Sequence, residues 1–187
     1  MKTVLISGAS GMLGEAFCNH FTSSAREINI LKMAKADFSL TKQDLIKKFS
    51  KYNISHIIHC AALTDADFCE KNPKLAKLVS EKCNEAILTL GKINCAQVVL
   101  PQSFLIYDGK INPVDETTPP NPISIYGKIK LETEEFFKNN TDKFLIVRMG
   151  GFFGGYEKDE NFVGKFIKII KTEIIRGKKE IVFIVFI

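Results

Sequence analysis

The chain has 187 residues, of which 45% are hydrophobic and 25% charged, and its formal net charge is +5. This length suits one domain with a hydrophobic core of its own, and its dispersed lysines argue against nucleic-acid binding. No apolar run approaches the roughly 20 residues that span a membrane, and the histidines and five cysteines lack metal-type spacing. An odd number of cysteines without paired spacing favours reduced thiols and therefore a cytoplasmic protein.

Short β-branched segments alternate with segments of helical periodicity along the chain. Strands are expected at residues 3–7, 27–31, 55–62, 97–100 and 143–149, and helices at 12–21, 41–52, 73–94, 126–139 and 161–175. This alternation predicts right-handed crossovers and a parallel sheet covered by helices on both faces. We therefore expect an α/β fold, a Rossmann-type doubly wound sheet in three α/β/α layers, as a single domain over residues 1–187.

A glycine-rich segment, GASGMLG, directly follows the first expected strand and opens the first helix. Its glycines permit a tight turn and let backbone N–H groups approach a pyrophosphate at the positive end of that helix. Because the segment has the strand–turn–helix context that the motif requires, it predicts a dinucleotide site rather than a plain glycine turn. The expected cofactor contacts here are Gly8, Ser10, Gly11, Met12, Leu13 and Gly14.

The end of the second expected strand bears on the choice of coenzyme. It carries Lys32 and Lys35, and no carboxylate follows until Asp37. An acidic residue here would bind the 2′-hydroxyl of NAD, whereas a basic one suits the 2′-phosphate of NADP. We therefore favour NADP(H) over NAD(H), with Lys32 as a contact; the alternative is that both lysines are simply solvated.

Tyr126 and Lys130 lie four residues apart, on one face of an expected helix. A free phenol has a pKa of about 10, and we expect the nearby ammonium to lower it. The phenol could then give a proton to a carbonyl that receives hydride, while Lys130 keeps donors for the nicotinamide ribose. This spacing is common by chance, so its weight comes from the glycine turn that precedes it.

Five segments in chain order resemble the dTDP-4-dehydrorhamnose reductase-like branch of the extended short-chain dehydrogenases/reductases. They are GASGMLG, HCAALTDADFCEKNP, YDG, PVDETTPPNPISIYGKIKLETE and IVRMGGFFGG with the later NFV. The resemblance covers roughly residues 1–175. It implies an oxidoreductase that reduces a nucleotide-linked 4-keto-6-deoxy sugar with NAD(P)H, in polysaccharide biosynthesis.

The resemblance also implies roles for individual residues. Ser103 stands where the family has a threonine that binds the substrate carbonyl oxygen, so it joins Tyr126 and Lys130 as a catalytic residue. Asp37 and Phe38 resemble the adenine-contacting pair, although Asp37 could instead cap its loop. The remaining expected contacts are Cys60, Ala61 and Ala62 for the cofactor, and Thr64, Arg148 and Asn161 for the substrate.

Several positions depart from the family pattern. Phe104 and Leu105 replace an Asp-Tyr pair, and residues 150–151 are glycines where the family has serine and tryptophan. Ser80 stands at the place of an asparagine that holds a relay water, with Asn84 one turn later. The chain then ends in GKKEIVFIVFI, and we expect the C-terminal substrate lobe to be largely missing.

Alternatives to an active reductase stay open. The chain could bind NADP without catalysis and serve a partner enzyme, as the regulatory subunits of methionine adenosyltransferase do, or be a remnant that keeps only the fold. It could also be a nucleotide-sugar epimerase or dehydratase, although Phe104 argues against a dehydratase. A nucleotide sugar is the expected small-molecule partner, and a homodimer is left open.

Overall fold

The computed structural model describes residues 2–24, 28–111 and 113–151. The chain divides into one compact unit of residues 1–150 and a second of residues 151–187, and the fold set out below is that of the first. The helix expected at 161–175 lies outside the described residues. A single domain over the whole chain therefore stays a prediction.

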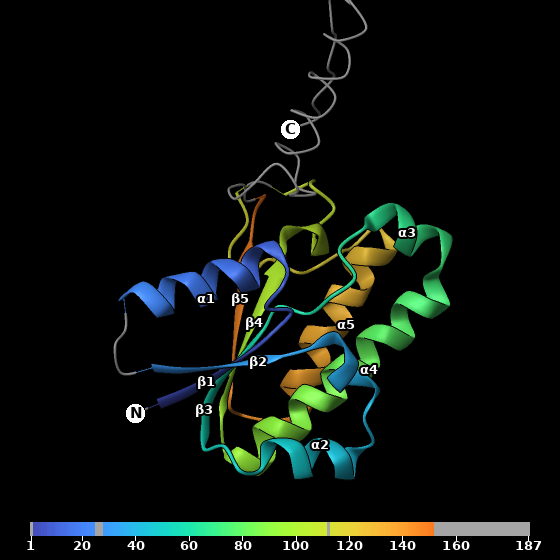
Figure 1. Ribbon diagram of the computed structural model, residues 1–187. Helices are drawn as coiled ribbons and strands as arrows, with labels where there is room; N and C mark the ends of the chain where they lie inside the picture. The colour runs from blue at the N-terminus through green and yellow to red at the C-terminus, as the bar shows by residue number, and fades with distance from the viewer. Residues whose placement is uncertain (1, 25–27, 112, 152–187) are drawn as a thin grey trace, which may run out of the picture. The chain divides into compact units, whose positions relative to one another are not determined.

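Strands and helices alternate through the first unit, as the sequence predicts (Figure 1). The strands are β1 (Lys2–Ser7), β2 (Ile28–Met33), β3 (Ile54–His59), β4 (Gln97–Ser103) and β5 (Phe144–Met149). The α-helices are α1 (Met12–Ser24), α2 (Lys42–Phe49), α3 (Ala66–Lys71), α4 (Pro73–Asn94) and α5 (Ile125–Asn140), and the 3-10 turns are η1 (Lys35–Ser39) and η2 (Phe104–Ile106).

The predicted bounds of α4 are confirmed, and Thr41, just before α2, caps that helix by accepting a hydrogen bond from Asp44 N. The third strand ends at His59, three residues before its predicted end, because residues 60–62 leave the sheet as a loop. The sequence analysis did not predict α3, η1 or η2.

The strands form one parallel sheet in the order β2-β1-β3-β4-β5. After β2 the chain crosses back over β1, so the strand order reverses direction between β1 and β3. Open α/β sheets bind ligands outside the carboxyl ends of the strands at such a switch point. Ser7 and His59, the last residues of β1 and β3, are register partners there.

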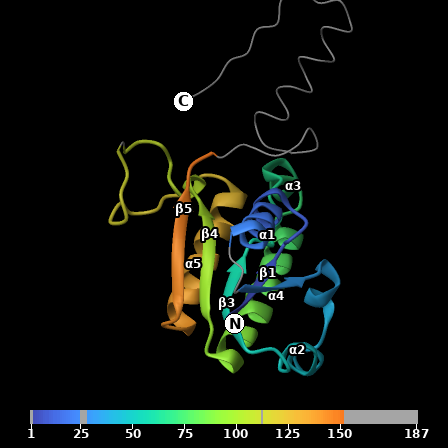
Figure 2. The ribbon, with the colours of Figure 1, turned by 60° about the vertical axis from the view of Figure 1, so that its left-hand side comes forward.

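The alternating side chains of β1 are apolar on both faces because helices cover both. Leu5 belongs to a core cluster that includes buried residues of α2, α4 and α5, whereas Val4 and Ile6 pack with Cys18 of α1. Figures 1 and 2 show α1 on one side of the sheet and α4 with α5 on the other. Burial on both faces is what continuous apolar strands indicate, and the expected three-layer Rossmann-type fold is confirmed.

Candidate functional site

The turn after β1 is packed so closely that its glycines cannot be replaced without displacement. Gly8 has a φ of +67°, and a Cβ at this position would lie 2.7 Å from the Ala61 backbone nitrogen. A Cβ on Gly14 would lie 2.2 Å from the Gly8 carbonyl oxygen, which already accepts a hydrogen bond from Gly11 N at 3.0 Å. The amino terminus of α1 is therefore held against the carboxyl edge of the sheet, where a helix can receive an anion.

The other predicted cofactor residues near this turn come from two adjoining segments. Cys60 N donates to the Ser7 carbonyl oxygen and Ala61 N donates to Ser7 Oγ, each at 3.2 Å. The glycine turn and the exit of β3 therefore lie side by side at the switch point. The turn contributes Ser10 and Gly11, α1 begins with Met12 and Leu13, and Ala62 follows in the β3 exit.

At the predicted adenosine end of the site, Asp37 caps its own loop, and its contact with adenine stays a prediction. Its buried carboxylate accepts a hydrogen bond from Ala34 N at 2.9 Å and forms an ion pair with Lys48. The structure thus shows the loop cap that was the alternative interpretation. Phe38 packs its ring beside that of His59, with 6.5 Å between centroids. Lys32 is exposed, one residue before the end of β2.

Tyr126 is placed by the first turn of α5. Ser124 caps this helix by accepting a hydrogen bond from Gly127 N at 3.0 Å. A Cβ on Gly127 would lie 2.2 Å from the Leu105 carbonyl oxygen, so the helix start sits directly against η2. The Ser103 hydroxyl, at the end of β4, lies on the side of the Tyr126 phenol and lowers its pKa, while its oxygen accepts a hydrogen bond from Leu105 N at 3.2 Å.

Lys130 completes the predicted catalytic group, with its Nζ 5.8 Å from the Tyr126 ring centroid. Burial lowers the pKa of Lys130 to about 8, against smaller opposing effects of Cys60, Cys69 and Glu134. Burial also raises the pKa of Tyr126, Cys69 raises it further, and the Ser103 hydroxyl lowers it. The expectation that Lys130 lowers the pKa of Tyr126 is therefore wrong here, because burial outweighs the favourable contacts.

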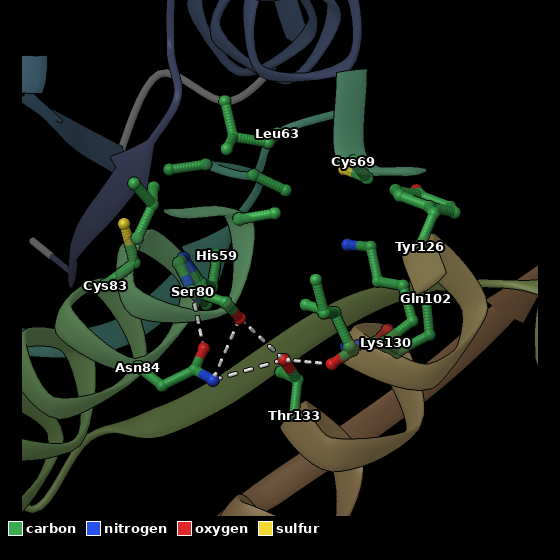
Figure 3. A pocket seen from close by; sticks show the side chains of 15 residues that line it. His59, Leu63, Cys69, Ser80, Cys83, Asn84, Gln102, Tyr126, Lys130 and Thr133 are labelled. Carbon is green, nitrogen blue, oxygen red and sulfur yellow. Dashed lines mark hydrogen bonds between the residues drawn. The ribbon is translucent and has the colours of Figure 1, made fainter. Parts of the chain in front are cut away.

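A buried polar layer lies beneath these groups, and the sequence analysis did not identify it (Figure 3). Ser7 Oγ is 2.7 Å from His59 Nδ1, and His59 Nε2 is 3.3 Å from Asn84 Oδ1. Asn84 Nδ2 donates to Thr133 Oγ1 at 3.1 Å, and that oxygen is also 3.2 Å from Ser80 Oγ. The layer thus joins β1 and β3 to α4 and α5. Its one signal in the sequence is the pair of polar residues a turn apart in α4.

Arg148, expected to bind substrate, holds other partners in the structure. Its Nε and Nη2 donate to the two carboxylate oxygens of Glu134 at 3.1 and 2.8 Å, and Nη1 donates to Tyr107 Oη at 2.8 Å. Glu134 is fully buried in α5. The arginine therefore ties β5 to α5 and to the loop after η2, and its contact with substrate stays a prediction.

Two more predicted substrate contacts can be placed only in part. Thr64 is exposed in the loop that precedes α3, while Asn161 lies outside the described residues. A Cβ added to Gly150 or Gly151 would meet nothing within 4 Å.

In the described ranges, histidine, cysteine, aspartate and glutamate side chains form no group of three that could hold a metal ion. No helix there has the length and apolar character of a membrane span.

His59 should make the fold sensitive to acid. Burial, and to a smaller extent the charge of Lys130, lower its pKa to about 4, against the raising effect of the hydrogen bond with Asn84. Below the ordinary value of about 6.5 the unfolded chain binds a proton that the native chain does not bind until pH reaches about 4. Stability is therefore lost as pH falls through this window. Between pH 6.5 and 5 we expect the wild type to lose about 2 kcal/mol more unfolding free energy than His59→Gln, measured by urea denaturation.

The control is His20→Gln, which changes an exposed histidine of α1 and should keep the pH slope of the wild type. An identical slope for wild type and His59→Gln would contradict the assignment of a neutral buried imidazole.

Breaking the Arg148–Glu134 pair should destabilise the fold. Arg148→Ala would leave a buried carboxylate whose remaining cation, Lys138 Nζ, lies 3.6 Å away, and we expect a loss of about 3 kcal/mol in urea denaturation. Adding Glu134→Leu to that variant should restore part of the loss, since no buried charge then remains. Lys77→Ala, which breaks an exposed pair with Glu132, is the control and should have no measurable effect. Equal losses of unfolding free energy in Arg148→Ala and Lys77→Ala would refute the structural role of the Arg148–Glu134 pair.

Comparison with known proteins places this geometry in a family. The family model described as RmlD substrate binding domain matches residues 1–175. The crystal structure of dTDP-4-dehydrorhamnose reductase from Bacillus anthracis in complex with NADP superposes with a TM-score of 0.81, at 29% identity over 92% of this chain and 61% of that one. Epimerase structures below 25% identity, such as one from Thermotoga maritima at 17% and a TM-score of 0.77, share the fold alone.

Two curated relatives differ in what their names describe. Methionine adenosyltransferase 2 subunit beta of Xenopus laevis is 28% identical over 84% of this chain and 49% of its own length. Spore coat polysaccharide biosynthesis protein SpsK of Bacillus subtilis is 28% identical over 92% of this chain and 60% of its own length. The chain thus spans about half to three fifths of the relatives it matches. With residues 1–175 matched, it belongs to the RmlD substrate-binding-domain family.

Proposed function

We propose that this chain carries the cofactor and proton-transfer half of an NADPH-dependent oxidoreductase that reduces a nucleotide-linked 4-keto-6-deoxy sugar, as in dTDP-4-dehydrorhamnose reduction. The observation that carries the proposal is that Tyr126 at the start of α5, Lys130 one turn later and Ser103 at the end of β4 converge at one place. This group lies at the carboxyl edge of the sheet that also bears the glycine turn. The likeness to SpsK supports a place in polysaccharide biosynthesis.

Different residues would bind the cofactor and transfer the proton, according to where they lie. The turn at Gly8 and the amino terminus of α1 would receive the pyrophosphate of NADPH, which when bound supplies hydride to the substrate carbonyl. Ser103 and Tyr126 would hold the carbonyl oxygen between their hydroxyls. Tyr126 then gives its proton to that oxygen, and the Ser103 hydroxyl turns its single donor from the substrate oxygen to the phenolate that is left. Lys130 has free donors for the nicotinamide ribose.

NADP(H) is favoured over NAD(H) by the charges at the end of β2. The Asp37 carboxylate is buried and already bound by Lys48 and Ala34 N. The exposed residue at this strand end is Lys32, a partner for a 2′-phosphate. The NADP complex of the Bacillus anthracis relative supports the same coenzyme. We place the protein in the cytoplasm, where its free cysteines would stay reduced.

A second candidate function is an NADP-binding subunit of another enzyme. The likeness to methionine adenosyltransferase 2 subunit beta favours it. The two functions share the glycine turn and differ in the need for Tyr126 and Ser103 to act on a substrate. Catalysis ranks first because these two side chains and Lys130 converge at one place. A dehydratase ranks below both, since Phe104, half exposed beside Ser103, provides no acid, and an epimerase ranks below both because the epimerase structures share only the fold.

Tyr126→Phe tests the proposed catalysis. We expect NADPH oxidation with 4-keto-6-deoxy sugar nucleotides, followed by absorbance at fixed protein concentration, to fall by about 100-fold or more, because the general acid is lost. The NADPH dissociation constant should change little. Tyr52→Phe, which alters a tyrosine packed at the far end of the sheet beside Phe49, should keep the wild-type rate.

The outcomes separate the candidate functions. Tight NADPH binding by the wild type without turnover of any such sugar would overturn the reductase and support the subunit function. Failure to bind either NADH or NADPH would overturn both.

Lys32→Glu tests the coenzyme preference. Loss of the 2′-phosphate contact and repulsion by the new carboxylate should weaken NADPH binding by about tenfold or more relative to NADH, measured by fluorescence titration. Lys51→Glu makes the same charge change at an exposed position after α2 and should leave the NADPH/NADH ratio unchanged. A Lys32 variant with an unaltered ratio would remove the argument for NADP.

A further inference from the structure

A small cavity of about 30 Å³ lies behind Lys130, between the sheet and helices α4 and α5 (Figure 3). Strand β4 and the helices turn polar side chains toward it. Those that matter here are Gln102, Ser80, Asn84, Lys130 and Thr133. A single water needs roughly 10–15 Å³ of such space together with two to four polar partners. The cavity therefore has both the room and the lining for one or two water molecules.

Two complementary groups on its wall have no hydrogen-bond partner. Gln102 is 4% exposed, and its Oε1 is buried without a donor, the one such side-chain atom in the part of the chain that the structure describes. No hydrogen bond joins Lys130 Nζ to an acceptor among these same residues. An ammonium has three donors and no acceptor, while an amide oxygen only accepts. Leaving the buried amide oxygen unpaired would be costly, and Lys130 is the complementary donor on the same wall.

We propose that Gln102 is a positioning residue for Lys130, joined to it by a water molecule bound in this cavity. The water accepts a hydrogen bond from Nζ and donates one to Gln102 Oε1. Its second donor faces the hydroxyl oxygens of Ser80 and Thr133, which lie 3.2 Å apart. This bridge fixes the position of the Lys130 ammonium beneath Tyr126 and favours the charged form of the lysine.

The other groups that face Lys130 cannot replace this bridge. Glu134 is occupied by Arg148 at both carboxylate oxygens, and the buried imidazole is held between Ser7 and Asn84. Thiols with a raised pKa are poor partners for an ammonium. The groups that face Lys130 are Tyr126 and Glu134 from α5, His59 at the end of β3, Cys60 just after it, and Cys69 from α3.

The experiment follows Lys130 directly, so it can fail independently of the proposed reductase. The full chain is labelled with ¹³C at lysine Cε, and the Lys130 signal, assigned by its loss in Lys130→Arg, is titrated by NMR. In Gln102→Leu we expect the midpoint to fall by about one pH unit, because the charged form loses its acceptor. In Gln102→Glu we expect it to rise. Gln97→Leu, on the same strand and away from the cavity, should match the wild type.

The two Gln102 variants keep the test decisive. Unchanged midpoints in folded Gln102→Leu and Gln102→Glu would overturn the proposal. If Gln102→Leu does not fold, Gln102→Met, which also lacks the amide oxygen, takes its place: a lowered midpoint in that variant supports the proposal, and an unchanged one overturns it. If the wild type does not bind NADPH or shows no turnover, the proposed function is refuted. The Lys130 midpoints, and the positioning role that they test, do not depend on that result.

Discussion

The close approach of two backbones at Gly8 is the constraint on which the site depends. No side chain fits between this residue and Ala61, so the β1 turn and the exit of β3 share one position at the switch point. Ser7, just before the glycine, then reaches both the Ala61 amide and the His59 imidazole. The same contact that shapes the glycine turn therefore anchors the polar layer beneath Lys130.

A second contact of the same kind places the proton-transfer half. Gly127 lies against the Leu105 carbonyl, which fixes the first turn of α5 to the end of β4 and brings Tyr126 to Ser103. The neighbouring strands β1, β3 and β4, paired side by side, lie between these two contacts. The distance from the glycine turn to the phenol is thus set by strand spacing and does not depend on any loop.

The sequence predicts those parts of the site whose signal is local. Periodicity and glycine spacing are enough for the strands, α4 and the turn, and the spacing of Tyr126 and Lys130 needs only one helix. Pairings between distant segments leave no such signal. A basic residue on a strand, such as Arg148, fits a substrate contact or a buried ion pair equally well until Glu134 is known to face it. Likewise, Asp37 could be assigned as a cap only once Lys48 was known to lie beside it.

The sign of the pKa shift at Tyr126 could not be predicted either, because burial is a property of the packed site. Because the pKa of Tyr126 is raised and not lowered, a different contact becomes important for the proposed catalysis. A general acid must carry its proton before the reaction, and a phenol with an ordinary pKa of about 10 already does so at neutral pH; burial raises this pKa further. What remains is to favour the phenolate once the proton has gone. Ser103, whose hydroxyl lowers the pKa of Tyr126, lies at the right atom to do this. In the proposed mechanism the serine is then a partner of the acid as well as a contact for the carbonyl, and Lys130 acts mainly by position.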